Sequence, residues 1–233
     1  MKLGKRLTQL NKMIPEGYEH IWDCCCDHGL LGMTLLKRYA APNIHFVDIV
    51  PKLVETLELK LLKAFPEGSN NQPEWSVSCS DVSHLPLDKH EGKHLVIIAG
   101  VGGDEVINLV DKLHQRFPSF NIDYLLCPVY HQYAVRQHLI RLGFGLLDER
   151  LVKERRQFYE ILHITSQACS GEKISPVGKR IWQGQTEAHI EIASAYLRRT
   201  LAHYKKAQRS LGDEVDKVIQ AYERCAEQIR LIT

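Results

Sequence analysis

The chain has 233 residues, of which 44% are hydrophobic and 25% are charged, and its net charge is +2. These values predict a soluble globular protein with one large domain, or one domain with an appendage, and they exclude recognition of a polyanion by overall charge alone. Because no run approaches the ~18 apolar residues of a membrane span and no apolar segment follows the basic N-terminal residues, we expect neither a membrane anchor nor a signal peptide.

The first half of the chain predicts alternating helices and strands. Apolar residues recur at helical spacing over residues 3–14, and the runs 21–26 and 44–49 are typical of buried strands. A helix is predicted after each strand, over residues 30–38 and 51–64, and the second begins at Pro51, where proline is tolerated. Residues 68–73 predict a loop and residues 75–79 a third strand.

The second half continues the alternation and then closes with a hairpin. Residues 94–99 predict a buried strand, followed by a glycine-rich turn and a helix from about Asp104. A fifth strand over 124–127 precedes a helix that ends near Arg141, and strands around 146–152 and 158–165 form a hairpin. This order predicts an α/β protein with a mostly parallel sheet, helices on both faces and an antiparallel end hairpin. That combination is the Rossmann-like sheet of class I methyltransferases.

From residue 186 onward the pattern becomes purely helical. Apolar residues recur at helical spacing up to Tyr204 and again from Val215, with a break at Gly212. We therefore expect an antiparallel helical hairpin, joined to the sheet by a linker over 170–184. The predicted domains are a catalytic domain over 1–168 and a helical extension over 169–233, in a monomer or a weak dimer formed through the hairpin.

Candidate ligand contacts follow the carboxyl ends of the predicted strands, where doubly wound sheets bind their ligands. Asp48 is placed to accept hydrogen bonds from ribose hydroxyls and Asp81 to accept one from an adenine amino group. Each also has a simpler interpretation, Asp48 as a turn residue and Asp81 as a helix cap, but their joint placement favours a cofactor site. The predicted cofactor contacts are Asp23, Cys25, Gly29, Asp48, Ile49, Asp81, Val82, Ala99 and Gly100.

Two other kinds of site are disfavoured. A dinucleotide site requires Gly-x-Gly-x-x-Gly after the first strand, and the segment from Asp23 to Gly29 lacks the first two glycines. We expect no metal, because the adjacent residues Cys24 to Cys26 do not converge easily on one ion with His28, and the twelve histidines show no ligand spacing. Seven cysteines, an odd number, do not predict a disulfide framework and favour a reducing cytoplasm.

Several motifs together are similar to those of a known family. They are Gly4-Lys-Arg-Leu7, Asp23, Asp27-His28, Ile98-Ala-Gly-Val-Gly-Gly103, Pro128 and Phe158-Tyr-Glu-Ile-Leu162. In this order, and with a helical hairpin after them, they resemble the bacterial tRNA adenine-N1 methyltransferases that act at position 22, the TrmK family. The resemblance covers essentially the whole chain. It implies S-adenosyl-L-methionine as cofactor and tRNA as substrate.

The chain departs from that family at three places. Family members carry glycine where Cys25 stands and methionine where Val101 stands, and Gln-Pro-Asn where this chain has Cys127-Pro-Val129. The resemblance therefore implies a divergent member. Three alternatives stay open: another target nucleotide, a methyltransferase with a non-tRNA substrate, and a non-catalytic module that binds RNA or a partner.

The resemblance also implies a mechanism. Adenine N1 attacks through its lone pair, so catalysis is mainly positioning of the two reacting atoms. Asp27 is the predicted catalytic residue, orienting the exocyclic amine or taking up its proton, and His28 is predicted to hold Asp27. Asp27 has an alternative role as the cap of the following helix.

Substrate contacts are expected around the glycine turn and on clusters of basic residues, because phosphate contacts dominate affinity for nucleic acids. A charged cluster is also a common feature of an ordinary solvated surface, which is the alternative for each arginine. The predicted substrate-binding residues are Arg6, Val101, Gly102, Gly103, Pro128, Arg155, Arg198 and Arg199.

Overall fold

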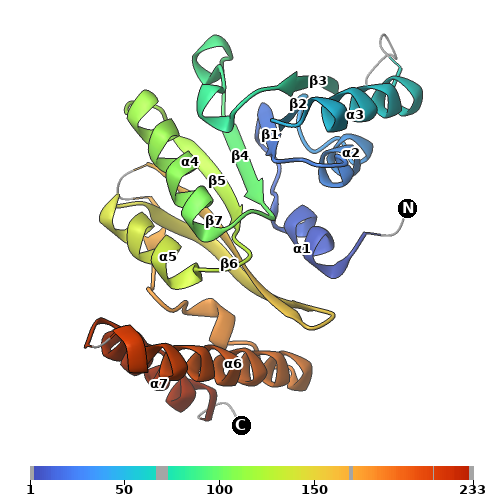
Figure 1. The fold of residues 1–233 in the computed structure, drawn as a ribbon. Helices are drawn as coiled ribbons and strands as arrows, with labels where there is room; N and C mark the ends of the chain where they lie inside the picture. Colours follow the sequence, from blue (N-terminus) through green and yellow to red (C-terminus); the bar gives the residue numbers. More distant parts are fainter. Residues whose placement is uncertain (1–2, 67–72, 168–169, 212, 231–233) are drawn as a thin grey trace.

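An eight-stranded sheet of order β3-β2-β1-β4-β5-β7-β6-β8 forms the centre of the protein in a computed structural model that describes residues 3–66, 73–167, 170–211 and 213–230 (Figure 1). The strands from β3 to β5 pair in parallel, and β7, β6 and β8 continue the sheet antiparallel. The strands are β1 His20–Cys24, β2 Asn43–Asp48, β3 Glu74–Cys79, β4 His94–Ala99, β5 Ile122–Cys127, β6 Gly145–Glu154, β7 Gln157–Thr165 and β8 Glu172–Lys173.

Helices cover both faces of this sheet. Neighbouring strand residues point to opposite faces, so Ile21 packs in one hydrophobic cluster with Leu35 of α2, while Trp22 packs in the other with Val110 of α4. The helices on the first face are α1 Lys5–Met13, α2 Leu30–Lys37 and α3 Pro51–Ala64, and those on the second are α4 Gly103–Arg116 and α5 Gln132–Arg141 (Figure 1). The predicted α/β architecture with an antiparallel end hairpin is confirmed.

One local expectation needs correction. The predicted strand over 21–26 ends at Cys24, because Cys25 has a left-handed backbone (φ 55°) and turns the chain out of the sheet. Between β3 and β4, where no helix was predicted, the chain makes two short 3₁₀ turns, η1 Val82–His84 and η2 Leu87–Lys89. One face of β2 and β3 is therefore left without a helix. Most of the predicted loop over 68–73 lies outside the described residues.

The helical extension consists of α6 Glu187–Leu211 and α7 Asp213–Arg230, which pair with each other beside the β6–β7 hairpin (Figure 1). The expected helical hairpin is confirmed. Its apolar side packs on Leu151 of β6 and Phe158 of β7 together with Trp182 of the turn η3 Arg180–Trp182. Strand β8 extends the sheet within the linker. The division into domains at residue 168 remains a proposal.

A buried ionic cluster anchors the linker and the extension. The Arg136 guanidinium of α5 donates to Glu160 and Glu149, both at 2.6 Å, and all three side chains are 0% exposed. Tyr196 of α6 donates its hydroxyl proton to Glu160 at 2.5 Å. Burial favours a raised pKa for Glu149, but Arg136 and the backbone amides of the linker outweigh burial and hold that pKa below its ordinary value.

None of the helices in the described part of the chain has the length and apolar character needed to cross a bilayer.

Candidate active site

The loop after β1 contains three residues with a left-handed backbone. Cys25, Asp27 and Gly29 all adopt left-handed conformations, with φ of 55°, 51° and 67°. A Cβ on Gly29 would lie 2.4 Å from Leu57 of α3, so glycine is required there on steric grounds. Cysteine at position 25 adopts a conformation that favours glycine, which gives a physical meaning to the glycine that the TrmK pattern has there.

Asp48 connects the loops after β1 and β2. Its Oδ2 accepts a hydrogen bond from the Asp27 amide at 2.9 Å, and its Oδ1 accepts one from the Val50 amide at 3.1 Å. The expected turn role of Asp48 is therefore present. The same bonds place its carboxylate beside the loop of Asp27, at the carboxyl end of the parallel strands. Ile49, the next residue, is 67% exposed, so this edge presents an apolar side chain beside an acidic one.

Asp23 is a buried residue with a structural contact. Its side chain is 4% exposed, and its Oδ2 accepts a hydrogen bond from the Gly32 amide at 2.8 Å. Burial raises its pKa to about 7, against the opposing effect of that hydrogen bond, and the nearby Asp48 raises it further. Asp23 thus holds the start of α2 against β1, and so supports the loop that joins these two elements.

Asp81 follows β3 and caps η1. Its Oδ1 accepts hydrogen bonds from the Ser83 hydroxyl at 2.6 Å and the Ser83 amide at 2.7 Å. These bonds lower the pKa of Asp81, so the group is an anion at neutral pH. The expected cap role is present, and it orients the carboxylate at the sheet edge. Val82 packs its side chain into the core, which leaves its backbone as the part available to a ligand.

The predicted catalytic pair lies at the surface of this edge. The Asp27 and His28 side chains are 68% and 58% exposed, and His28 Nδ1 lies 3.7 Å from Asp27 Oδ1. The N-cap of α2 is Gly29, which has no side-chain cap, so the alternative role of Asp27 as the cap of this helix is wrong. The Asp27 carboxylate is thus free of a capping role.

The loops after the neighbouring strands β4 and β5 are hydrogen-bonded to each other. The Val129 amide donates to the Val101 carbonyl at 3.0 Å, and the Gly103 amide donates to the Tyr130 carbonyl at 3.1 Å. A Cβ on Gly102 would lie 2.3 Å from the Tyr130 hydroxyl. Glycine at position 102 therefore leaves the space that the Tyr130 side chain occupies. Tyr130 is 52% exposed. Nothing in the local sequence pattern around Tyr130 marks it as a site residue, so it was not predicted.

Arg6 lies at the same edge although it comes from α1. Its guanidinium is 5.2 Å from the centroid of the Tyr159 ring, and a Cβ on Gly100 would lie 3.2 Å from its Nη1. Gly100 has φ 95°, so its backbone also requires glycine. The predicted residues Arg6, Ala99 and Gly100 are therefore brought together, and Pro128 is buried beneath the neighbouring loop.

The basic residues further along the chain separate into two settings. Arg155 and Arg198 are exposed. Arg199 is exposed as well, but it donates to the Arg156 carbonyl at 2.7 Å and to the Gln157 side chain at 3.0 Å and so connects α6 to the β6–β7 turn. Beside Arg199, a cavity of about 250 Å³ separates the extension from the loop after β5. Its aromatic lining comes from Tyr130, Phe158, Tyr196, Tyr204 and Tyr222.

The three adjacent cysteines do not converge on one point. Cys24 and Cys25 pack toward one hydrophobic cluster and Cys26 toward the other. Burial raises the pKa of the Cys25 thiol to about 12, so the thiolate that binds metals is disfavoured. Three histidines from distant parts of the chain, His20, His45 and His90, do lie close together, with ligand nitrogens within 4.8 Å of one another. Their separation in the sequence left no motif to detect.

Residues 3–162 match the model of a family described as "Methyltransferase domain". The chain belongs to this methyltransferase family. The matched segment runs from α1 into β7 and includes every predicted cofactor contact of this methyltransferase. A search of curated proteins finds no match to the chain.

Solved structures with the same fold cover the methyltransferase from end to end. TrmK of M. capricolum, solved with S-adenosyl-homocysteine, is 19% identical with a TM-score of 0.69, and the match covers 100% of this chain and 98% of that one. The B. subtilis m1A22 tRNA methyltransferase TrmK is 20% identical, TM-score 0.66, covering 99% and 97%. A putative tRNA (m1A22) methyltransferase of Streptococcus pneumoniae, solved with S-adenosyl-L-methionine, is 16% identical, TM-score 0.68, covering 96% and 99%. At these identities the likeness establishes the fold, including the helical extension.

Proposed function

We propose that this methyltransferase transfers a methyl group from S-adenosyl-L-methionine to N1 of an adenine in tRNA. The observation that carries the proposal is the full-length match to TrmK structures, which includes the helical extension as well as the family domain. The motifs around Asp27 and the glycine turn support it independently.

The residues present fit an adenosine-type cofactor. The strands end at two carboxylates, Asp48 and Asp81, placed for ribose hydroxyls and an adenine amino group, and the exposed Ile49 offers an apolar surface to the adenine ring. The left-handed loop around Gly29 and the positive φ of Gly100 allow close approach of the ligand to the backbone. S-adenosyl-L-methionine supplies an electrophilic methyl group when bound. Asp23 acts on the cofactor indirectly, because its buried carboxylate positions α2.

Asp27 is the proposed catalytic residue for the acceptor base. Methylation at N1 makes adenine cationic, and a carboxylate close to the exocyclic amine stabilises that charge or takes up the amine proton. The 68% exposure of Asp27 means that the substrate itself has to cover the pair and exclude water. His28, at 3.7 Å, contributes a second polar group on the same side of the loop.

The tRNA contacts are proposed on two surfaces. Arg6, Val101 and Gly102 are proposed to contact the acceptor at the sheet edge, and the buried Gly103 and Pro128 to shape the turns beside it. Arg155 and Arg198 extend a basic surface along the β6–β7 turn and α6, to which Arg199 contributes while it holds that turn in place. We propose the cytoplasm as the compartment, because the six cysteines identified as free thiols are compatible with a reducing environment.

Two measurements test the proposal. Calorimetry should detect binding of one S-adenosyl-L-methionine per chain, weakened by Asp48→Ala and unchanged by Asp88→Ala, an exposed aspartate in η2 remote from the sheet edge. Incubation with the cofactor and unmodified bacterial tRNA should produce 1-methyladenosine, detected by nucleoside mass spectrometry. Cofactor binding without transfer to any RNA would favour a different acceptor, and the absence of cofactor binding would favour a non-catalytic module.

A further inference from the structure

A polar groove lies on the face of β2 and β3 that no helix covers. The short turns η1 and η2 between β3 and β4 leave a cavity of about 360 Å³ over these strands. Ser76 and Ser78 of β3 are exposed on its floor, and Trp22, His45 and His90 line its inner end. The groove is therefore accessible to solvent at one end and lined by imidazoles at the other.

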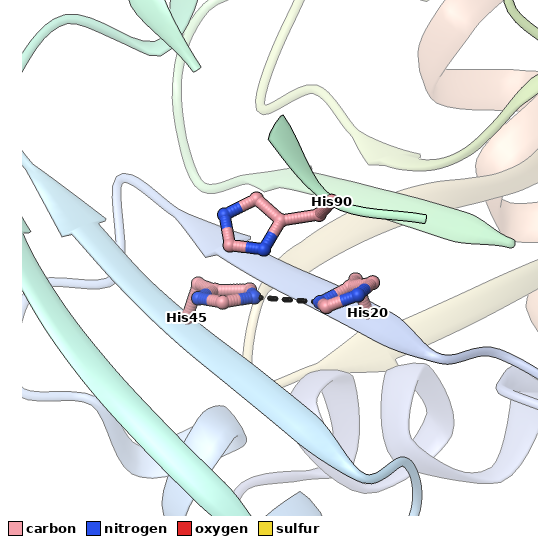
Figure 2. Close-up of side chains that lie close together, drawn as sticks. All are labelled: His20, His45 and His90. Carbon is pink, nitrogen blue, oxygen red and sulfur yellow. Dashed lines mark hydrogen bonds between the residues drawn. The ribbon is translucent and has the colours of Figure 1, made fainter. Parts of the chain in front are cut away.

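Three imidazole rings from three separate segments meet at this inner end (Figure 2). His20 begins β1, His45 lies in the middle of β2, and His90 follows η2. His20 Nδ1 and His45 Nε2 are 3.0 Å apart. The His90 ring is tilted over both, with its centroid 4.8 Å from that of His20 and 5.2 Å from that of His45. Three nitrogen atoms, one from each ring, lie within 4.8 Å of one another.

Neighbouring groups hold the first two rings in place. His45 Nδ1 is hydrogen-bonded to Ser76 Oγ at 2.7 Å, and the His45 ring stacks on Trp22 with centroids 3.9 Å apart. The backbone carbonyl of Glu91 lies beside the His20 ring as an acceptor for its N–H. Metal-binding histidines commonly have such a partner on the second ring nitrogen, because it fixes the orientation of the ring.

The His90 ring differs from the other two in its hydrogen bonding. In the described part of the chain the His90 ring makes no hydrogen bond of its own, whereas its backbone carbonyl is bonded to His94 Nε2 at 3.1 Å. The ring is also partly exposed to the groove. His90 is thus held at its backbone. Its ring packs against His20, Trp22 and His45 and has, among the described residues, no hydrogen bond that a metal ion would have to replace.

We propose that His20, His45 and His90 form a binding site for a divalent zinc-type metal ion. Zinc binds imidazole nitrogen at about 2.0–2.1 Å in tetrahedral geometry, which places two ligand nitrogens roughly 3.3 Å apart. The 3.0 Å between His20 and His45 is already close to that spacing, and a side-chain movement of about 1.5 Å brings His90 to it. The fourth position faces the groove and takes water. Three neutral imidazoles favour zinc, copper or nickel over magnesium and calcium, which require oxygen ligands.

The position of the site indicates a structural role. His20 is the first residue of β1 and His90 precedes β4, so the ion lies toward the amino ends of the strands, away from the carboxyl ends that carry Asp48 and Asp27. Bound there, the ion cross-links β1, β2 and the η2 segment. It thereby stabilises the sheet on the face that no helix covers.

Titration of the whole protein with Zn²⁺ and with Co²⁺ tests the site. We expect one equivalent of ion, a visible Co²⁺ spectrum typical of tetrahedral nitrogen coordination, and a thermal midpoint that Zn²⁺ raises. His90→Ala should weaken binding at least tenfold and abolish the thermal shift. His84→Ala, an exposed histidine in the adjacent turn η1, is the matched control and should bind as the wild type does.

Two outcomes overturn the proposal. One is equal affinity of the wild type and His90→Ala, which would place the ion elsewhere. The other is a sulfur-to-cobalt charge-transfer band, which would assign the ion to the cysteines after β1. Circular dichroism of His90→Ala checks that its fold is intact. Because the readouts are metal affinity and the thermal midpoint, the result does not depend on methyltransferase activity.

Discussion

Arg136→Met removes the positive charge from a cluster in which Arg136, Glu149 and Glu160 are all 0% exposed. The two glutamates then remain buried without the guanidinium that donates to each at 2.6 Å. Breaking a buried ion pair in this way costs about 3–5 kcal/mol. Since whole domains are stable by only about 5–15 kcal/mol, we expect a large part of the stability to be lost.

Urea denaturation followed by far-ultraviolet circular dichroism measures this loss. With a denaturant dependence of about 3 kcal/mol per molar urea, the unfolding midpoint should fall by about 1–2 M. The matched control is Arg150→Met, because Arg150 is 48% exposed and pairs with Asp148 at 3.0 Å. An exposed pair contributes less than about 1 kcal/mol, so this variant should unfold close to the wild type.

Two further measurements separate lost charge compensation from lost packing. In the folded protein the pKa of Glu149 is below its ordinary value of 4.5, so its contribution is present above pH 4.5 and disappears as the pH falls through the folded-state pKa. The difference between wild type and Arg136→Met should therefore shrink in acid. Adding Glu149→Gln and Glu160→Gln to the variant should restore part of the stability. Equal destabilisation by Arg136→Met and Arg150→Met would refute the reasoning.

Three other variants probe the site. Asp27→Ala should lower kcat/KM for tRNA at least about 100-fold with an unchanged circular dichroism spectrum; full activity would remove Asp27 from the mechanism. Arg198→Glu with Arg199→Glu should weaken tRNA binding in filter assays and reduce its salt slope by about 2; an unchanged slope would count against this surface. Asp23 has a folded-state pKa of about 7 against 3.8, so its burial destabilises increasingly from pH 4 to 7. Asp23→Asn should therefore be more stable than the wild type by up to about 4 kcal/mol at pH 8 in urea unfolding. A stability difference between the two proteins that is the same at pH 5 and at pH 8 would contradict the raised pKa.

Local sequence patterns were sufficient for the order of elements. The apolar runs at 94–99 and 44–49 and the helix from Pro51 match observed elements to within a residue. Continuous apolar runs mark strands that are buried on both faces, and helical periodicity marks the buried side of a helix. Asp48 lies at the carboxyl end of β2 and Asp81 follows β3, as the predicted strand positions imply, and their role in binding a cofactor stays a prediction.

Features that depend on contacts between distant segments were not visible. Arg136 has the pattern of a surface residue of a helix, and only the approach of Glu149 and Glu160 from the hairpin makes its burial tolerable. His20 and His45 come together because β1 and β2 pair in a register that places Trp22 beside His45. The two-residue strand β8 is too short to have a periodicity. Cys25 was assigned to a strand because it belongs to an apolar run, and its left-handed backbone, which ends the strand, has no signal in that run.

The most direct test of the proposed function uses two tRNA transcripts that differ only at position 22, one with adenosine and one with guanosine. Each is incubated with purified protein and S-adenosyl-L-methionine, digested to nucleosides and analysed by mass spectrometry. We predict 1-methyladenosine from the first transcript and none from the second, with Asp27→Ala inactive on both. Equal amounts of 1-methyladenosine from the two transcripts would place the target at an adenine other than position 22, and its absence from both under conditions where the cofactor binds would contradict the proposal.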